Sequence, residues 1–121
     1  MLLKLIQTPK GRGLAATCNI QSGTIVEVSP TILIPRSAAE ALEIAGIDSY
    51  PFIWDDFHLA LAMGLGSFFN HSYVPNAEFD LLEETQQIKF SAIKNILQGE
   101  EVSINYNGDP KDQSLLWFEV K

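Results

Sequence analysis

The sequence has little cysteine, little histidine and few basic residues, and each shortage excludes a class of function. One cysteine, Cys18, and two histidines, His58 and His71, cannot form an internal disulfide or a Cys/His zinc cluster. Eight lysines and arginines against fifteen aspartates and glutamates give a formal net charge of -7. This charge argues against nucleic acid or anionic lipid as a partner and favours a basic partner. We interpret Cys18 as a small buried thiol in a reducing compartment.

Long apolar runs are also missing. The N-terminal MLLKLIQTPKGRG begins with an apolar stretch that is too short for a signal segment and is ended by Pro9 and basic residues. No later run approaches the length of a membrane span. We therefore expect no membrane partner and an intracellular protein, cytoplasmic by default with a nuclear location left open. A homodimer is also left open.

What is present is enough apolar material for one core. The chain has 121 residues, of which 46% are hydrophobic and 19% charged, so residues 1–121 are expected to form a single domain. Alternation and β-branched residues between Gly, Pro and polar turns indicate a mainly β fold of many short strands. Turns are expected at residues 11–13 and 21–23 and at Pro30, which should separate two strands. The expected strands are 2–6, 14–16, 24–28, 31–34, 77–82, 87–93 and 101–106.

Little helix is expected. Ser37 and Glu40 have the spacing of a capping box, which predicts one short helix that continues to Ala45 and ends at Gly46. The segment 60–69 is apolar nearly all round and contains glycines, which favours a buried helical turn or two. His58 would then lie at a helix start.

The segment GRGLAA, residues 11–16, formally satisfies the pattern G-x-G-x-x-A. A dinucleotide site also needs a helix that begins inside this pattern, and the residues after it are poor helix formers. The dinucleotide interpretation is therefore excluded. Two interpretations are left, a bare backbone loop that serves a ligand and a plain turn between strands.

Two further segments carry unusual polar groups. NHSYVPN, residues 70–76, places two amides and an imidazole between an apolar segment and a strand. These groups indicate a functional site. The alternative is a local Asx turn at Asn76 with His71 in the core. GEEVSINYNG, residues 99–108, is a strand whose alternation draws Tyr106 inside, although a Tyr at a sheet end with its hydroxyl in water fits equally well.

Together, GRGLAA, FFNHSYVPN and GEEVSINYN occur in the order and wording of the SET domain of protein-lysine methyltransferases, which this chain strongly resembles. The resemblance covers residues 2–107. It implies a SET-type fold of several short-stranded sheets, with minor helix and a pseudoknot near the C-terminus. It also implies transfer of a methyl group from S-adenosyl-L-methionine (SAM) to the side-chain amine of lysine in a basic, lysine-containing protein substrate.

The resemblance assigns roles to individual residues. It implies that the backbone of Gly11, Arg12 and Gly13 holds the methionine end of SAM. Asn70 and the backbone beside it would bind the amino-acid part of SAM, and the backbone of His71 would contact the adenine. Tyr106 matches the catalytic tyrosine and would also contact the cofactor. No metal is implied.

The chain departs from the family's pattern in four places. Tyr73 stands where many members have Cys, and no cysteine-rich tail follows, so residues 112–121 are expected to close the site. Trp117 would cover the cofactor and Phe118 would line the substrate channel; the alternative is a hydrophobic tail that completes the core. Phe79 and Ile104 would also line the channel, in places where tyrosine or another aromatic is frequent, and a wider channel could accept a methylated lysine. Both residues could equally be ordinary core.

Two other functions are compatible with these residues. A catalytically weak SET module could bind a basic protein tail or SAM without turnover, because a fold does not guarantee activity. A purely structural β domain would leave the polar cluster at residues 70–76 unexplained.

Overall fold

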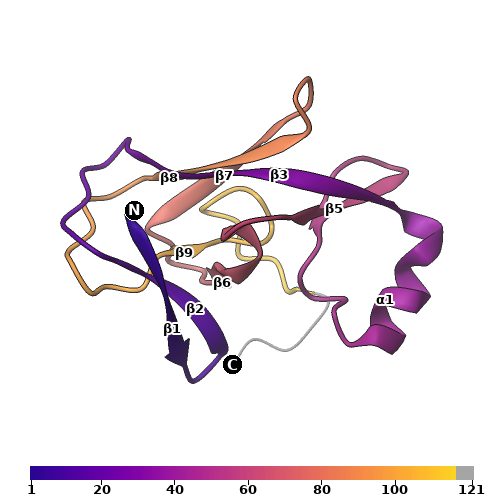
Figure 1. Cartoon of the computed structure of the whole chain (residues 1–121), viewed down its shortest axis with the longest axis horizontal. Coiled ribbons are helices and arrows are strands. Elements are labelled where there is room, and N and C mark those ends of the chain that lie inside the picture. Colours follow the sequence, from indigo (N-terminus) through magenta and orange to yellow (C-terminus); the bar gives the residue numbers. More distant parts are fainter. Residues whose placement is uncertain (117–121) are drawn as a thin grey trace.

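The computed structural model describes residues 1–116, and the strands in this part of the chain form three β-sheets (Figure 1). The mainly β prediction is confirmed. The largest sheet is antiparallel, with strand order β4-β5-β3-β8-β7. Its strands are β3 (Ile25–Pro35), β4 (Phe52–Ile53), β5 (His58–Ala62), β7 (Ala77–Leu82) and β8 (Gln87–Ala92).

The two smaller sheets have two strands each. β1 (Leu3–Thr8) and β2 (Gly11–Ala16) form an antiparallel hairpin, whereas β6 (Asn70–His71) and β9 (Ser103–Ile104) pair in parallel. The glycines of GRGLAA therefore lie in a strand, and the turn predicted at residues 11–13 is wrong. Thr8 pairs with Gly11, so the reversal of the chain falls at Pro9 and Lys10, where a proline suits a turn.

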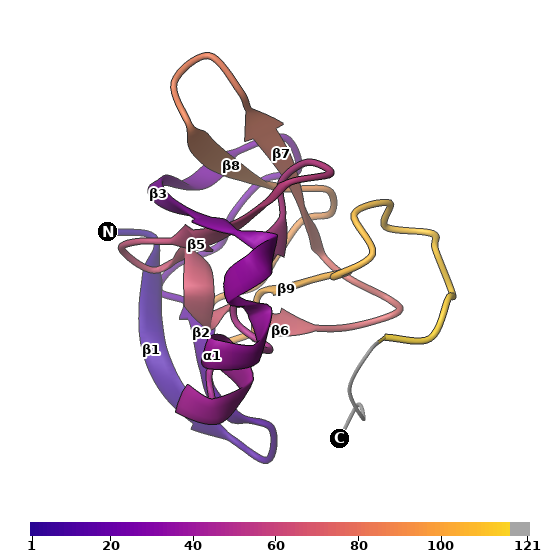
Figure 2. The same ribbon diagram turned by 90° about the vertical axis from the view of Figure 1, so that its right-hand side faces the viewer.

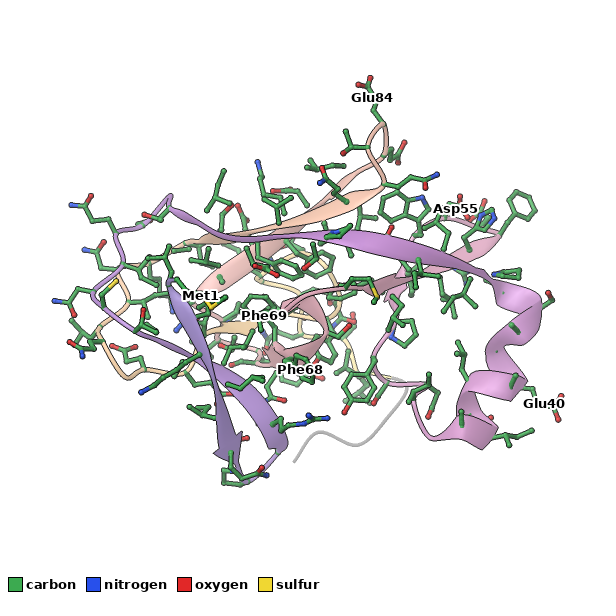
Figure 3. All side chains as sticks on the ribbon, in the orientation of Figure 1. Met1, Glu40, Asp55, Phe68, Phe69 and Glu84 are labelled. Carbon is green, nitrogen blue, oxygen red and sulfur yellow. The ribbon has the colours of Figure 1, made fainter. Side chains whose placement is uncertain are left out.

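The hairpin of β7 and β8 confirms the prediction from alternation. In β8, Ile88, Phe90 and Ala92 are buried while Lys89 and Ser91 are half-buried, which is the period of a strand with one face on the core. The acidic turn between the strands contains Glu84 at its tip (Figure 3).

Pro30 does not divide its strand, and this prediction is wrong. The first part of β3 pairs with β8 up to Pro30, and the second part pairs with β5 from Thr31 onward. Pro30 lies where the partner changes, and its carbonyl accepts a hydrogen bond from Met63 N–H at 2.8 Å. Because the ladder to β5 ends there, the missing N–H of proline costs no pairing.

The helix is present, but its predicted start is wrong. A 3-10 turn, η1 (Arg36–Ala38), leads into α1 (Ala39–Ala45), whose N-cap is Ala38 without a side-chain hydrogen bond. Ser37 is inside η1 and so is not at the N-cap, and the capping box does not form. Gly46 ends α1 at φ 76°, as predicted. α1 lies at one end of the large sheet, beyond the end of β3 (Figures 1 and 2).

The segment 60–69 contains one helical turn, the 3-10 segment η2 (Gly66–Phe68), but the prediction is wrong for the residues before it. The first residues belong to β5, which pairs on both sides, with β3 and β4, and a turn follows. A short apolar run does not distinguish strand from helix by its period. His58 accordingly begins β5, and the prediction that it lies at a helix start is wrong. Its Nδ1 lies 3.0 Å from Asp55 Oδ1. Cys18 is exposed, so the buried thiol is also wrong.

Two side chains of β3 hold the turn that leads into β6. The Glu27 carboxylate accepts a hydrogen bond from Leu65 N–H at 2.9 Å, and the buried Ser29 hydroxyl accepts one from Gly66 N–H at 3.2 Å. Phe69 follows this turn and stacks on Phe90 with ring centroids 4.3 Å apart (Figure 3). The three sheets thus share one core, and the chain enters β6 from a turn anchored to the long strand. Among the helices in residues 1–116, none is long and apolar enough to cross a membrane.

Gly66→Ala should lower the free energy of unfolding by about 1–3 kcal/mol, because it overpacks the core at this turn. A Cβ there would collide with Ser29 Oγ and lie 2.8 Å from Ala62 Cβ and 2.9 Å from a Phe90 ring carbon. Gly46→Ala is the control: nothing lies within 4 Å of its Cβ, so only the positive φ costs about 1 kcal/mol. Urea unfolding measures both variants. Equal losses would show that the turn has room for a methyl group.

Candidate functional site

The centre of the site is the parallel pair of β6 and β9. Asn70 pairs with Ser103 and His71 with Ile104, and Ser72 N–H continues the contact by donating to the Ile104 carbonyl at 2.8 Å. Residues separated by more than thirty positions therefore lie side by side. The pairing brings the polar cluster 70–76 next to the strand that leads to Tyr106, as Figure 2 shows for β6 and β9.

Asn76 reinforces this pairing from the far end of the cluster. Its side-chain amide donates to the Glu101 carbonyl at 2.8 Å and accepts from Ser103 N–H at 2.9 Å. The amide thus acts like another residue of a β ladder, bonded to both groups of the neighbouring backbone. The alternative of a local Asx turn at Asn76 is wrong, because both of these partners are more than twenty residues away in sequence.

Gly13 lies in β2, which contacts the residues just before β9 on the side away from Asn76. β2 reaches the residues before β9 through a bridge between Ala15 and Glu101 and a hydrogen bond from Val102 N–H to the Leu14 carbonyl at 2.8 Å. A Cβ on Gly13 would lie 2.6 Å from Asn70 Nδ2 and 2.7 Å from Glu101 Oε2. Glycine is therefore required by close packing, and not by a turn.

Asn70 and Glu101 form a polar cluster on this glycine. Asn70 Nδ2 donates to Glu101 Oε2 at 2.7 Å, and Thr8 Oγ1 lies 3.4 Å from the same nitrogen. Lys10 Nζ donates to the His71 carbonyl at 2.8 Å. A carboxylate and an amide are thus bonded to each other on this glycine, and an ammonium group is bonded to the backbone of His71, the residue after Asn70.

Arg12 is exposed beside this cluster. Its guanidinium carbon lies 4.9 Å from the centroid of the Phe68 ring, a cation–π contact that holds the side chain on η2.

Tyr106 lies two residues beyond β9 and is held at both of its ends. Its backbone N–H donates to His71 Nδ1 at 2.9 Å, and its hydroxyl donates to the Phe69 carbonyl at 2.5 Å. Burial raises the pKa of the Tyr106 phenol above its ordinary value, and Tyr50 and Glu101 raise it further. The phenol is therefore neutral at physiological pH and acts as a hydrogen-bond donor.

Tyr106 also lines a narrow cleft. The cleft has a volume of about 300 Å³, including the space open to solvent, and its wall combines the segment before β5 with η2 and Phe69. Its lining residues are Ser49, Tyr50, Pro51, Phe52, Ile53, Gly66, Ser67, Phe69 and Tyr106. The cleft is small and mostly apolar, with the hydroxyls of tyrosine and serine as its polar groups.

The predicted site residues fall into three groups. Gly13, Asn70, His71 and Tyr106 are brought together by β2, β6 and the end of β9, with Gly11 and Arg12 in the same strand β2. Phe79 packs edge-on against Phe52 at 4.9 Å and is not a lining residue of the cleft; Ile104 is fully buried in the core. Trp117 and Phe118 lie outside the described residues.

Sequence reasoning missed Glu101, and it considered Tyr50 only within residues 50–54, as an alternative to the tail for closing the site. Both are single residues without a recurring pattern, and only the packing of β2 and the segment before β4 brings them to Asn70 and Tyr106. Residues 1–116 contain no group of three or more His, Cys, Asp or Glu side chains that could hold a metal ion.

The structure thus defines a mainly β domain with two features side by side. One is the cleft lined by Tyr106, and the other is the hydrogen-bonded pair of Asn70 and Glu101 that packs on Gly13. Comparisons with known proteins identify this arrangement. Residues 11–107 match the family model described as SET domain. A Schizosaccharomyces pombe protein named "Histone-lysine N-methyltransferase, H3 lysine-37 specific" is 32% identical over 111 residues, which cover 91% of this chain and 71% of that protein.

A solved structure supports the same fold. It belongs to a Plasmodium falciparum protein provisionally named a histone methyltransferase, and it has a TM-score of 0.63 at 23% identity, covering 88% of this chain and 98% of that chain. The chain belongs to the SET-domain family. The resemblance carried by the three sequence motifs and the SET-type fold are confirmed, while the pseudoknot crossing stays a prediction.

Asn76→Ala should lower the free energy of unfolding by about 1–3 kcal/mol, because it removes two hydrogen bonds to the backbone before β9. Asn19→Ala is the matched control, since that exposed amide makes one bond, to Gln98 N–H at 2.8 Å. Denaturant unfolding should show the larger loss for Asn76. A loss no greater than that of Asn19→Ala would mean that β6 and β9 stay paired without this amide.

Proposed function

We propose that this protein transfers a methyl group from SAM to the side-chain amine of a lysine in a protein substrate. The observation that carries the proposal is Tyr106, a neutral phenol held at a narrow cleft by the segment that also supplies Asn70 to the Gly13 cluster. Membership of the SET-domain family and the name of the S. pombe relative support the same activity.

The polar cluster suits the amino-acid end of SAM, which carries one ammonium and one carboxylate group. The Glu101 carboxylate and the Asn70 amide oxygen can accept hydrogen bonds from the ammonium group of SAM. The cations Lys10 and Arg12 can bind its carboxylate group. The absence of a side chain on Gly13 leaves its backbone close to these groups. Gly11, Gly13, Asn70 and His71 are thus the residues that would hold the cofactor. When bound, SAM supplies a methyl group on a positively charged sulfur.

The cleft beside Tyr106 would take the lysine side chain. A lysine ammonium has no lone pair, and its ordinary pKa of about 10.4 keeps it protonated at neutral pH. A small apolar cleft removes water and so lowers the pKa of the amine, which favours the neutral form. Because the Tyr106 phenol is itself neutral, it orients the amine and does not remove its proton.

Charge supports a basic protein as the substrate. A second groove of about 820 Å³, including the space open to solvent, lies beside α1 and shares Pro51 and Ile53 with the cleft. Its lining contains two acidic residues, Glu43 and Asp48, and one basic residue, Arg36. With the net charge of -7, these carboxylates favour a lysine-rich segment around the target lysine. The S. pombe relative is named for a lysine of histone H3, and we infer a histone or a similar basic protein as substrate here.

The start of the tail packs on the site, which supports its proposed role in closing the cleft. Tyr73 hydroxyl and Asn107 Nδ2 both donate to the Ser114 carbonyl, at 3.0 and 2.8 Å. The buried Asn105 donates to the Asp112 carbonyl at 2.5 Å. Residues 112–114 are therefore bound to the two neighbours of Tyr106 in the chain and to Tyr73. The cofactor role of Trp117 and the channel role of Phe118 stay predictions.

Asn70→Ala should weaken SAM binding by more than about tenfold while the protein stays folded, because a lost charge-assisted hydrogen bond is worth ~1.5–3 kcal/mol. Calorimetry measures the affinity. Asn95→Ala is the matched control, since this exposed amide accepts one bond from Ser22 N–H at 2.9 Å on a distant loop, and its affinity should be that of the wild type. Unchanged affinity in Asn70→Ala would place the cofactor elsewhere.

Tyr106→Phe should lower kcat by more than about tenfold and change SAM affinity little, because the hydroxyl is assigned to the alignment of the amine. Labelled SAM with histone H3 or a cell lysate, followed by mass spectrometry, gives the rate and the modified site. Loss of rate and affinity together would contradict the role of Tyr106. SAM binding by the wild type without any methyl transfer would instead favour the module that binds without turnover.

A further inference from the structure

Tyr106 depends on His71 for its backbone position. β9 ends at Ile104, so the N–H of Tyr106 lies beyond the sheet ladder, and its partner is the imidazole Nδ1 of His71 at 2.9 Å. The other end of Tyr106, its hydroxyl, is bonded to the carbonyl of Phe69, two residues before His71. A single short segment, 69–71, therefore holds both ends of this tyrosine.

The hydrogen bond determines the protonation state of the ring. A backbone N–H can only donate, so Nδ1 must accept, and the one proton of the neutral ring must be on Nε2. His71 is 3% exposed, and Nε2 has no hydrogen-bond partner among residues 1–116. A second proton on Nδ1 would place two donors face to face and abolish the bond to Tyr106.

The surroundings of the ring favour the neutral form. The rings of Tyr73 and Tyr106 contact it edge-on, with centroids 4.4 and 5.3 Å away, and Lys10 binds the His71 carbonyl. Burial lowers the pKa of His71 below its ordinary value of 6.5, and the charge of Lys10 lowers it further. Among the described residues, no carboxylate contributes to this shift. The stability that the neutral ring supplies is complete above pH 6.5 and is lost as the pH falls through the lower pKa of the folded protein.

From these contacts we propose that His71 is a positioning residue: its neutral imidazole fixes the backbone of Tyr106 through Nδ1, and protonation of the ring releases it. The inference rests on the proposed function only for its consequence, which is that methyl transfer depends on this bond. The bond itself exists in the protein without ligands. A residue already expected to bind the cofactor through its backbone thus has a second task, carried by its side chain.

Two variants with the same number and branching of side-chain heavy atoms isolate the acceptor. In His71→Asn, Oδ1 is attached to Cγ as Nδ1 is in histidine, so the bond to Tyr106 N–H can be kept without a titrating group. His71→Leu removes the acceptor. The probe is the Tyr106 backbone amide of the ligand-free full chain, followed by 15N NMR and hydrogen exchange.

We expect the Tyr106 amide of the wild type to be protected at pH 8 and its resonance to shift as the pH falls through a value below 6.5. His71→Asn should keep the protection and lose this pH response. His71→Leu should lose at least about tenfold of the protection, the factor that corresponds to one hydrogen bond of ~1.4 kcal/mol. Equal protection in His71→Leu and wild type, or a Tyr106 amide that ignores the protonation of His71, would overturn the proposal. If His71→Leu does not fold, the missing pH response of His71→Asn still decides it.

Activity then tests the consequence. His71→Leu should lower kcat more than it raises the KM for SAM, and His71→Asn should restore most of kcat. Below pH 6.5, kcat/KM of the wild type should fall more steeply than that of His71→Asn. If His71 had a purely structural role, kcat/KM would fall equally steeply with pH in the wild type and in His71→Asn. If the wild type transfers no methyl group, the proposed function fails, while the NMR result still decides the role of His71.

Discussion

The parallel pairing of β6 with β9 is the contact on which the site depends. It joins only two residues of each strand, yet Asn70 and His71 lie on it, and Glu101, Lys10 and Tyr106 are hydrogen-bonded to these two residues. Parallel strands need a long connection, and here the connection is the β7–β8 hairpin and the loop that follows it. The cost of closing that long segment is offset by the core that the hairpin completes, with Phe90 stacked on Phe69 directly before β6.

Such a short pairing is stable only because neighbouring groups add further hydrogen bonds to the same backbone. Asn76 binds the backbone on both sides of Val102, and β2 pairs with the same segment from the other side. Val102 and Ile104 themselves are fully buried. The polar cluster at residues 70–76 therefore has a structural and a functional part. Asn76 stabilises the pairing of β6 with β9, whereas Asn70 faces the Gly13 side of the site and His71 faces the Tyr106 side.

The chemistry of the two halves differs in a way that the burial explains. The Gly13 side is polar, with Asn70 hydrogen-bonded to Glu101 and Lys10 bonded to the His71 carbonyl, and it suits a ligand that carries both signs of charge. The Tyr106 side is enclosed and mostly apolar, and the same enclosure that raises the pKa of the phenol would lower that of an amine. One environment thus keeps the tyrosine a donor and favours a neutral amine beside it.

Local signals in the sequence predicted those elements that local chemistry controls. Alternation over residues 77–82 and 87–93 indicated the hairpin, Gly46 indicated the end of the helix, and the three motifs carried the family and the residues Gly13, Asn70, His71 and Tyr106. Tertiary structure decided the rest. Pro30 stays within a strand because β3 changes partner there, and the first residues of the apolar segment 60–69 belong to β5 because two strands flank them. Glu101 reaches Asn70 and His71 reaches Tyr106 only after distant strands pair, and no periodicity within one segment records a contact between two segments.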